Sequence, residues 1–164
     1  MKDYWDAFLH SLRLPKKQSV FALNRIGMDI TVIYLFFLLA IASLPAFYEQ
    51  IMVNESSATH IHPFFLLIYF FIFYYLVLVL IVFSLLSIIA YIGTLITRGL
   101  KRKLRFSIIW KMTAFSITTP LLLFTVISFF HPLSSLFLFL ATIYIFFILI
   151  KIILIYPKRK VRQL

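Results

Sequence analysis

The sequence predicts an all-α membrane protein, a four-transmembrane-helix bundle preceded by an N-terminal interfacial amphipathic helix, with both termini cytoplasmic. Three observations predict this class. The 164 residues are 63% hydrophobic and only 13% charged, against roughly 25% charged residues in a soluble domain. Four long apolar runs are almost free of charge, and all sixteen Lys and Arg lie in 2–25, 98–111 and 151–162, beside those runs.

The distribution of charge excludes several function classes. A net charge of +11 and a pI near 10.1 would suggest nucleic-acid binding in a soluble protein. Here the basic residues flank apolar runs, which is the positive-inside pattern of membrane proteins. We therefore expect no nucleic-acid partner. The absence of cysteine excludes disulfides, thiol catalysis and cysteine metal sites.

Residues 1–25 form the predicted cytoplasmic or interfacial N-terminal segment. Between residues 4 and 14, helical spacing places Trp5, Phe8, Leu9 and Leu12 on one face. Such a helix is suited to the headgroup layer, or it rests as a packing arm on neighbouring helices. Both interpretations stay open. The helix is expected to end before Pro15, because proline disfavours continuation.

The transmembrane domain is expected to cover residues 26–156, and its first span is predicted at 26–47, ending at Pro45. Asp29 is the only charge in this span. Because Arg25 and Asp29 are four residues apart, on one helix they would share a face and form a boundary ion pair. Intramembrane carboxylates are often functional, so ion coupling is the alternative role for Asp29.

Residues 48–62 are predicted to form the extracytoplasmic loop between the first two spans. This loop contains Glu49 and Glu55 but no Lys or Arg. His60, His62 and, after the third span, His131 lie on the same side in this topology. These histidines raise the alternative of a surface metal site, although polar residues at the interface are the simpler interpretation. We expect no cofactor.

The second span is predicted as one helix over 63–95, because 33 residues are too few for two spans and a turn. At about 1.5 Å per residue it would be about 50 Å long and would tilt or extend beyond the bilayer. Its outer half is rich in aromatic residues. Its inner half places small and polar residues at spacings of three and four, which predicts a helix–helix interface; these residues are Ser84, Ser87, Tyr91 and Thr94.

A basic hinge connects the second and third spans. Its simplest role is topological, since Lys and Arg hold a loop in the cytoplasm. Each basic residue near the surface also contributes about 1 kcal/mol of attraction to anionic lipid. We predict headgroup contact for six residues: Arg98, Lys101, Arg102, Lys103, Arg105 and Lys111.

The third and fourth spans are predicted at 112–130 and 133–156, followed by a basic cytoplasmic tail at 157–164. Thr119 and Pro120 lie in the middle of the third span. Proline there kinks the helix, and neighbouring threonines can satisfy the carbonyls that it frees. We therefore assign Thr119 and Pro120 to a helix–helix interface.

Several motifs resemble a known family. They are FLHSLRLPKK, LNRIGMDITVIYLFFLLAIASLP and RGLKRKLRFSIIWKMTAFSITTPLLL, which include Arg25, Leu44-Pro45, Trp110-Lys111-Met112 and Thr119-Pro120. In these motifs the chain is similar to an uncharacterised (domain-of-unknown-function) family of Gram-positive multi-pass membrane proteins. That family is related to Yip-type membrane proteins. The resemblance implies a bacterial plasma membrane and an accessory role. Its members usually have a larger extracytoplasmic segment between the first two spans, which is shortened here to about fifteen residues.

The functional expectation is a non-enzymatic accessory, regulatory or scaffolding subunit. It would act through helix–helix contacts with other membrane proteins or a homo-oligomer, and through anionic membrane lipid. The alternative is a small oligomeric transporter or channel component, although such proteins usually place ionisable groups at the midplane. We predict no enzyme, because no nucleophile in the sequence has a nearby base.

Overall fold

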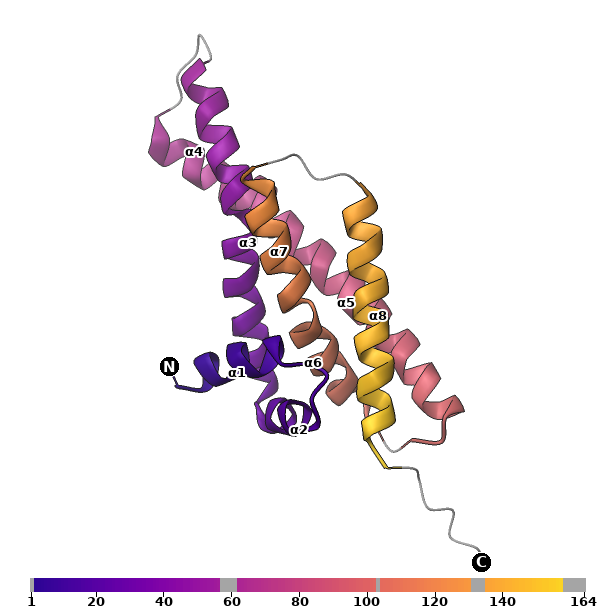
Figure 1. Cartoon of the computed structure of the whole chain (residues 1–164). Helices are drawn as coiled ribbons and strands as arrows, with labels where there is room; N and C mark the ends of the chain where they lie inside the picture. The colour runs from indigo at the N-terminus through magenta and orange to yellow at the C-terminus, as the bar shows by residue number, and fades with distance from the viewer. Residues whose placement is uncertain (1, 57–61, 103, 131–134, 158–164) are drawn as a thin grey trace, which may run out of the picture.

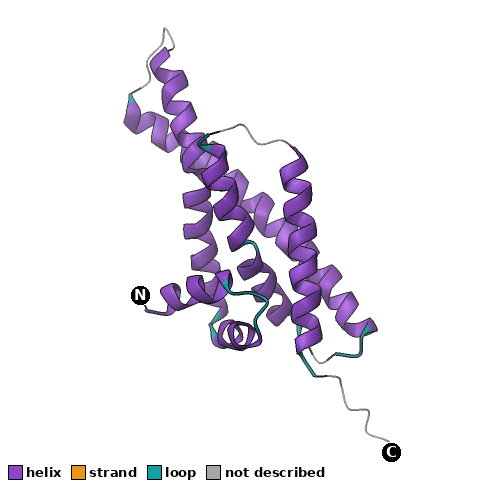
Figure 2. Cartoon of the chain, viewed as in Figure 1, coloured by secondary structure: helices purple, strands orange, loops and turns teal. Residues whose placement is uncertain are grey.

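The computed structural model describes residues 2–56, 62–102, 104–130 and 135–157. Within these ranges the chain is helical and has no strand (Figure 2). The elements follow in the order α1 (Lys2–Leu12), α2 (Lys17–Arg25), α3 (Met28–Ser56), α4 (Pro63–Phe70), the π-helix η1 (Phe71–Tyr75), α5 (Leu76–Gly99), α6 (Phe106–Ser116), α7 (Thr118–Ser128) and α8 (Ser135–Ile155).

Four segments of the described ranges are long and apolar enough to cross a membrane, as predicted. They are Met28–Asn54, Pro63–Gly99, Phe106–Ser128 and Leu136–Ile155. Figure 1 shows α7 lying along α3 and α8 standing farther from both, while α5 crosses the bundle at a slant. The slant suits a segment of 37 residues, which is longer than a bilayer requires when upright.

The first span is longer than expected, and the prediction that Pro45 ends it is wrong. Helix α3 continues through Pro45 to Ser56, so residues 48–56 are helix and not loop. A proline removes one backbone donor, and helices in apolar surroundings tolerate this loss where neighbours satisfy the freed group. Pro45 is buried, so packing holds the helix together at this point.

The second span is one continuous helical segment, as predicted, but it contains a π-helical turn at Phe71–Tyr75. His62 and Pro63 begin the segment, because a ring nitrogen of His62 accepts a hydrogen bond from the Phe64 backbone N–H at 3.3 Å. In the π-turn, the Tyr75 hydroxyl donates to the Phe36 carbonyl of α3 at 2.9 Å. This bond ties the wider turn to the first span.

The third span begins at Phe106, six residues earlier than predicted, and is broken at Ile117 into α6 and α7. Pro120 lies in the first turn of α7, where a missing backbone donor does least harm. The predicted kink therefore exists. Thr118 does not compensate the freed carbonyl as expected, since its hydroxyl bonds to Tyr34 at 2.9 Å.

The N-terminal segment folds into two helices, and α2 was not predicted. The predicted apolar face of α1 is only partly turned toward the bundle, because Trp5 is 63% exposed and Leu12 is exposed as well. Ala7 and Ser11 are buried instead. Helices α1 and α2 contact each other, and α1 contacts α3, α6 and α7. The segment therefore packs as an arm on the bundle.

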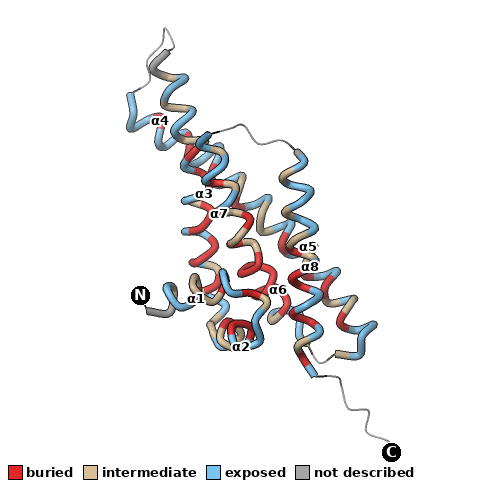
Figure 3. Tube along the Cα trace, viewed as in Figure 1, coloured by how far each residue is buried: buried red, intermediate tan, exposed pale blue. Residues whose placement is uncertain are grey.

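Helix α6 occupies the centre of the fold. Every residue from Ile109 to Ser116 is buried, and Figure 3 shows burial concentrated on α6 and the helices around it. One core cluster joins α6 to α1, α2, α3 and α8, and a second joins it to α3, α5 and α8. The ends of α3, α4 and α8 away from α2 are largely exposed.

Candidate functional site at the basic end of the bundle

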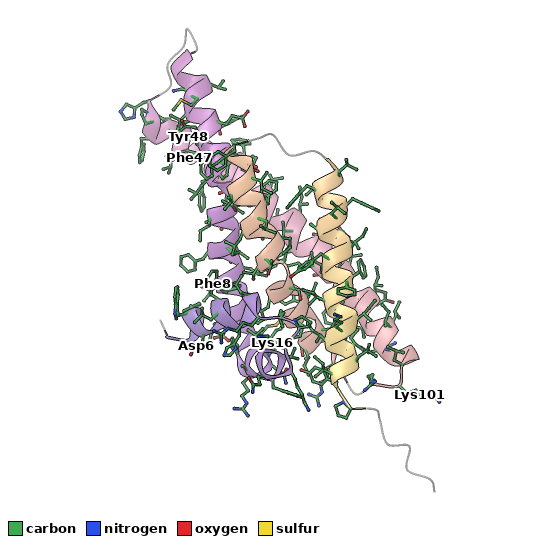
Figure 4. All side chains as sticks on the ribbon, viewed as in Figure 1. Asp6, Phe8, Lys16, Phe47, Tyr48 and Lys101 are labelled. Carbon is green, nitrogen blue, oxygen red and sulfur yellow. The ribbon has the colours of Figure 1, made fainter. Side chains whose placement is uncertain are left out.

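One end of the bundle collects most of the polar chemistry of the described residues. The α1–α2 pair, which we call the N-terminal hairpin (residues 2–25), lies there together with the α5–α6 connection and the last turn of α8 (Figure 1). Figure 4 labels Asp6, Lys16 and Lys101 at this end and Phe47 and Tyr48 at the other. Lys16 and Lys101 therefore lie at the same end of the bundle.

Lys111 fastens the hairpin to the bundle from inside. It is 8% exposed, and its Nζ donates to the backbone carbonyls of Asn24 and Ile26 at 2.8 and 2.7 Å. These carbonyls belong to the C-terminal end of α2, which lacks helical donors and carries partial negative charge. The predicted headgroup contact is therefore wrong for Lys111, because its ammonium group is hydrogen-bonded to backbone carbonyls of the protein.

A second set of hydrogen bonds joins the hairpin to the break in the third span. The buried Tyr34 hydroxyl lies 3.2 Å from Ser11 Oγ and 2.9 Å from Thr118 Oγ1. Ser11 Oγ also donates to the Phe8 carbonyl at 2.7 Å. The chain of hydroxyls connects α1, α3 and α7, and buried polar groups of this kind fix one arrangement of the helices they join.

A polar pocket of about 380 Å³ opens between the hairpin and the start of α3. Its polar lining residues are Asp6, His10 and Arg25. A ring nitrogen of His10 lies 3.4 Å from Ser19 Oγ, which holds the imidazole against α2. The pocket combines opposite charges and an imidazole, and the sequence alone did not bring these residues together.

Arg25, which lines this pocket, and Asp29 lie on two different helices. Arg25 ends α2, whereas Asp29 lies in the first turn of α3 after the extended residue Ile26. The predicted sharing of one helix face is wrong, and the described residues show no ion pair between the two. The Asp29 carboxylate instead lies beside Gly27, where a Cβ would collide with Oδ1, and its charge favours the N-terminus of α3.

The basic hinge contains a second helix cap. An Arg102 Nη1 donates to the carbonyl of Tyr156, just beyond α8. The Tyr156 hydroxyl is buried without a hydrogen-bond partner in the described residues, and burial raises its pKa. Arg102 is half-buried, so its guanidinium caps the end of α8 and is less accessible to lipid.

The end of α5 has the geometry of a Schellman motif with lysine in the position usually taken by glycine. Lys101 has a φ of 51°, its N–H bonds to the Arg98 carbonyl at 3.1 Å, and the Arg102 N–H bonds to the Thr97 carbonyl at 2.9 Å. These are the two bonds that define the motif. A left-handed lysine costs about 1–2 kcal/mol relative to glycine.

Three further hinge residues are exposed to solvent or lipid. Arg98, Lys101 and Arg105 are exposed, and Lys103 lies outside the described residues. Exposed basic residues of the hairpin lie at the same end of the bundle; they are Arg13, Lys16, Lys17 and Arg25. Headgroup contact for Arg98, Lys101 and Arg105 stays a prediction.

The predicted stripe on α5 does not form the helix–helix interface within the chain. Ser84, Ser87 and Tyr91 are exposed and Thr94 is half-buried. The packed face instead consists of Val79, Leu86, Ala90, Gly93 and Thr97. Periodicity alone could not separate these two neighbouring faces. Small Ala90 and Gly93 allow the closest approach, and a Cβ on Gly93 would lie 2.8 Å from Leu149 and 2.9 Å from Ile109.

Ser87 is the one stripe residue with a hydrogen bond to another described helix. The Trp110 Nε1–H donates to Ser87 Oγ at 3.2 Å. The hydroxyls of Ser84, Ser87 and Thr94 each donate to a carbonyl of their own helix four residues earlier, at 2.8 Å. Such self-satisfied hydroxyls can face lipid or a partner helix without an unpaired donor.

Thr119 and Pro120 face α8, as their assignment to an interface requires, but across a space. With apolar residues of α7 and α8 they line a cavity of about 260 Å³. Pro120 is buried and Thr119 is half-buried. The two helices therefore meet less tightly here than α5 and α6 do at Gly93.

The metal-site alternative falls mostly outside the described residues. His60 and His131 are not described, and His62 caps α4. In the described ranges, no group of three His, Cys, Asp or Glu residues lies close enough to hold a metal ion.

The comparisons with known proteins give a family and no activity. A family described as "Protein of unknown function (DUF1189)" matches residues 49–153, from the outer part of α3 to the last turn of α8. No match was found among curated proteins, and none among solved structures. The expected resemblance to an uncharacterised family is confirmed at this level. Because the match covers well over half of the chain, the protein belongs to the DUF1189 family.

Proposed function

We propose that the chain is a non-enzymatic accessory or scaffolding subunit of a bacterial plasma membrane, with both termini in the cytoplasm. The orientation rests on the positive-inside rule, since residues 26–97 and 112–150 contain no Lys or Arg. The kinship to Gram-positive, Yip-related membrane proteins belongs to the same proposal. Contact of the exposed basic residues with anionic lipid would hold this orientation.

One observation carries the proposal, namely the outward face of α5. The second span is the least buried of the four, with 22% of its most apolar window buried. Its outward face still carries polar side chains, Ser84 and the 60%-exposed Tyr91. Lipid does not drive helices together, so small and polar residues at close approach are what stabilise helix pairs in membranes. This face suits a helix of another membrane protein or a second copy.

Cysteine cross-linking tests this assignment cleanly, because the chain has no cysteine of its own. Single variants Ser84→Cys and Tyr91→Cys, expressed in native membranes, are labelled with a maleimide that carries a photoreactive diazirine and are then irradiated. The matched control is Ile143→Cys, on the exposed side of α8. We expect a discrete cross-linked species for the two α5 variants only. Monomer alone in all three variants contradicts the proposed interface.

A further inference from the structure

The end of the bundle opposite the basic residues contains a pocket that the proposed function does not use. With about 540 Å³ it is larger than the two pockets described above, and it lies between α3, η1 and α7. Tyr48, one of its lining residues, is labelled in Figure 4. Its polar side chains are Tyr48, Glu49, Tyr74 and Ser128, and Phe129 and Phe130 supply further rings.

The one charged residue among the described lining residues of this pocket is the acidic Glu49. Glu49 is exposed, and in the described ranges it forms no salt bridge; its electrostatic neighbour is the Tyr74 phenol. The spans that line the pocket bring no Lys or Arg, because these residues are absent from 26–97 and 112–150. A carboxylate without a counter-ion beside apolar walls attracts a cation.

Several aromatic rings line the same pocket as the Glu49 carboxylate. The rings of Tyr48 and Phe129 lie 6.4 Å apart between centroids, and Tyr74 stacks on Phe70 at 4.8 Å. Ring faces bind cations by cation–π attraction, and quaternary ammonium groups are recognised this way. A mostly apolar pocket with a few polar groups is also the usual form of a small-molecule site.

From these observations we propose that the pocket binds an amphiphilic organic cation with a single ammonium group. The ammonium group sits against the Glu49 carboxylate and the ring faces of Tyr48 and Phe129. The apolar body lies on Ala42, Ala46 and Phe124, which line the inner wall. A metal ion fits less well, because the pocket offers only one carboxylate. Aromatic rings would have to replace the water molecules that otherwise coordinate the ion.

The probe for this site is benzyltrimethylammonium, with neopentylbenzene as its uncharged counterpart of the same shape. Binding to the full chain in detergent is measured by equilibrium dialysis. We expect saturable binding of the cation, and weaker binding of the neutral compound that does not depend on Glu49. Absence of saturable cation binding to the wild-type chain overturns the proposal.

Three variants locate the cation. Glu49→Gln removes the charge and is expected to weaken binding about tenfold or more, whereas Glu49→Asp keeps most of the affinity. Phe129→Leu is expected to weaken it by a few-fold through the lost ring. Asp6→Asn, at the other end of the bundle, is the matched control and leaves binding unchanged. Equal affinity of the Glu49→Gln and wild-type chains overturns the proposal, and circular dichroism confirms that the variant is folded.

Discussion

The docking of the N-terminal hairpin depends on Lys111, and replacing this residue by methionine tests that dependence. Methionine keeps the length and the apolar stem of the side chain but removes the two hydrogen bonds to the carbonyls of Asn24 and Ile26. A hydrogen bond to a charged group is worth about 1.5–3 kcal/mol. Part of this loss is offset, because burying methionine avoids the desolvation cost of burying an ammonium group.

The substitution should therefore destabilise the docked hairpin by about 2 kcal/mol. This change raises the equilibrium constant for undocking of the hairpin roughly 30-fold. The substitution Val20→Cys reports this opening, since Val20 is a fully buried residue of α2 and the chain has no other cysteine. The rate at which maleimide labels the introduced thiol should therefore rise roughly 30-fold in the Lys111→Met background. Stopped labelling reactions resolved by mass spectrometry give the rate directly.

Lys151→Met is the matched control for this experiment. Lys151 is exposed, and its ammonium group lies over the ring of Phe147 on α8, away from the hairpin carbonyls. The same substitution there should leave the labelling rate of the Val20→Cys thiol unchanged. If Lys111→Met and Lys151→Met give the same labelling rate, Lys111 does not hold the hairpin and the reasoning fails.

Three further substitutions probe the packing, each followed by unfolding in detergent. Tyr34→Phe should lower the free energy of unfolding by about 1–3 kcal/mol, because two buried hydroxyl contacts are lost. The control Tyr144→Phe, at a half-buried ring, should change this free energy little. Gly93→Ala should be less stable than Gly99→Ala by about 1–3 kcal/mol, since a Cβ has no space at Gly93 and open space at Gly99. Lys101→Gly should stabilise the chain by about 1 kcal/mol, because glycine adopts the left-handed backbone conformation of residue 101 without strain. An unchanged or lower melting temperature contradicts this prediction.

Hydropathy and charge predicted the four spans because bilayer solvation acts on each segment separately. The same local signals placed the ends of the helices poorly. Pro45 was expected to end α3, yet the buried surroundings of that residue keep the helix intact to Ser56. Helix α2 was missed because it has only nine residues, and a helix this short is stable through packing.

The site was harder to predict because its bonds are non-local. Lys111 and its carbonyl acceptors are 85 and 87 residues apart, so the local sequence does not identify the acceptors. The run Trp110-Lys111-Met112 inside an apolar segment was a signal, since a charge at that depth needs a partner. The pairing of Tyr34 with Thr118, 84 residues away, had no comparable signal.

The anchoring of the hairpin on the third span has a consequence for biosynthesis. The hairpin leaves the ribosome first, but Lys111, which fastens it to the bundle, is made 85–87 residues after the carbonyls of Ile26 and Asn24 that it binds. At about 5–20 residues per second this delay lasts roughly 4–17 seconds. During that interval the nascent chain carries an undocked basic segment, which the anionic surface of the membrane can hold. Docking then marks the moment at which the third span has been inserted.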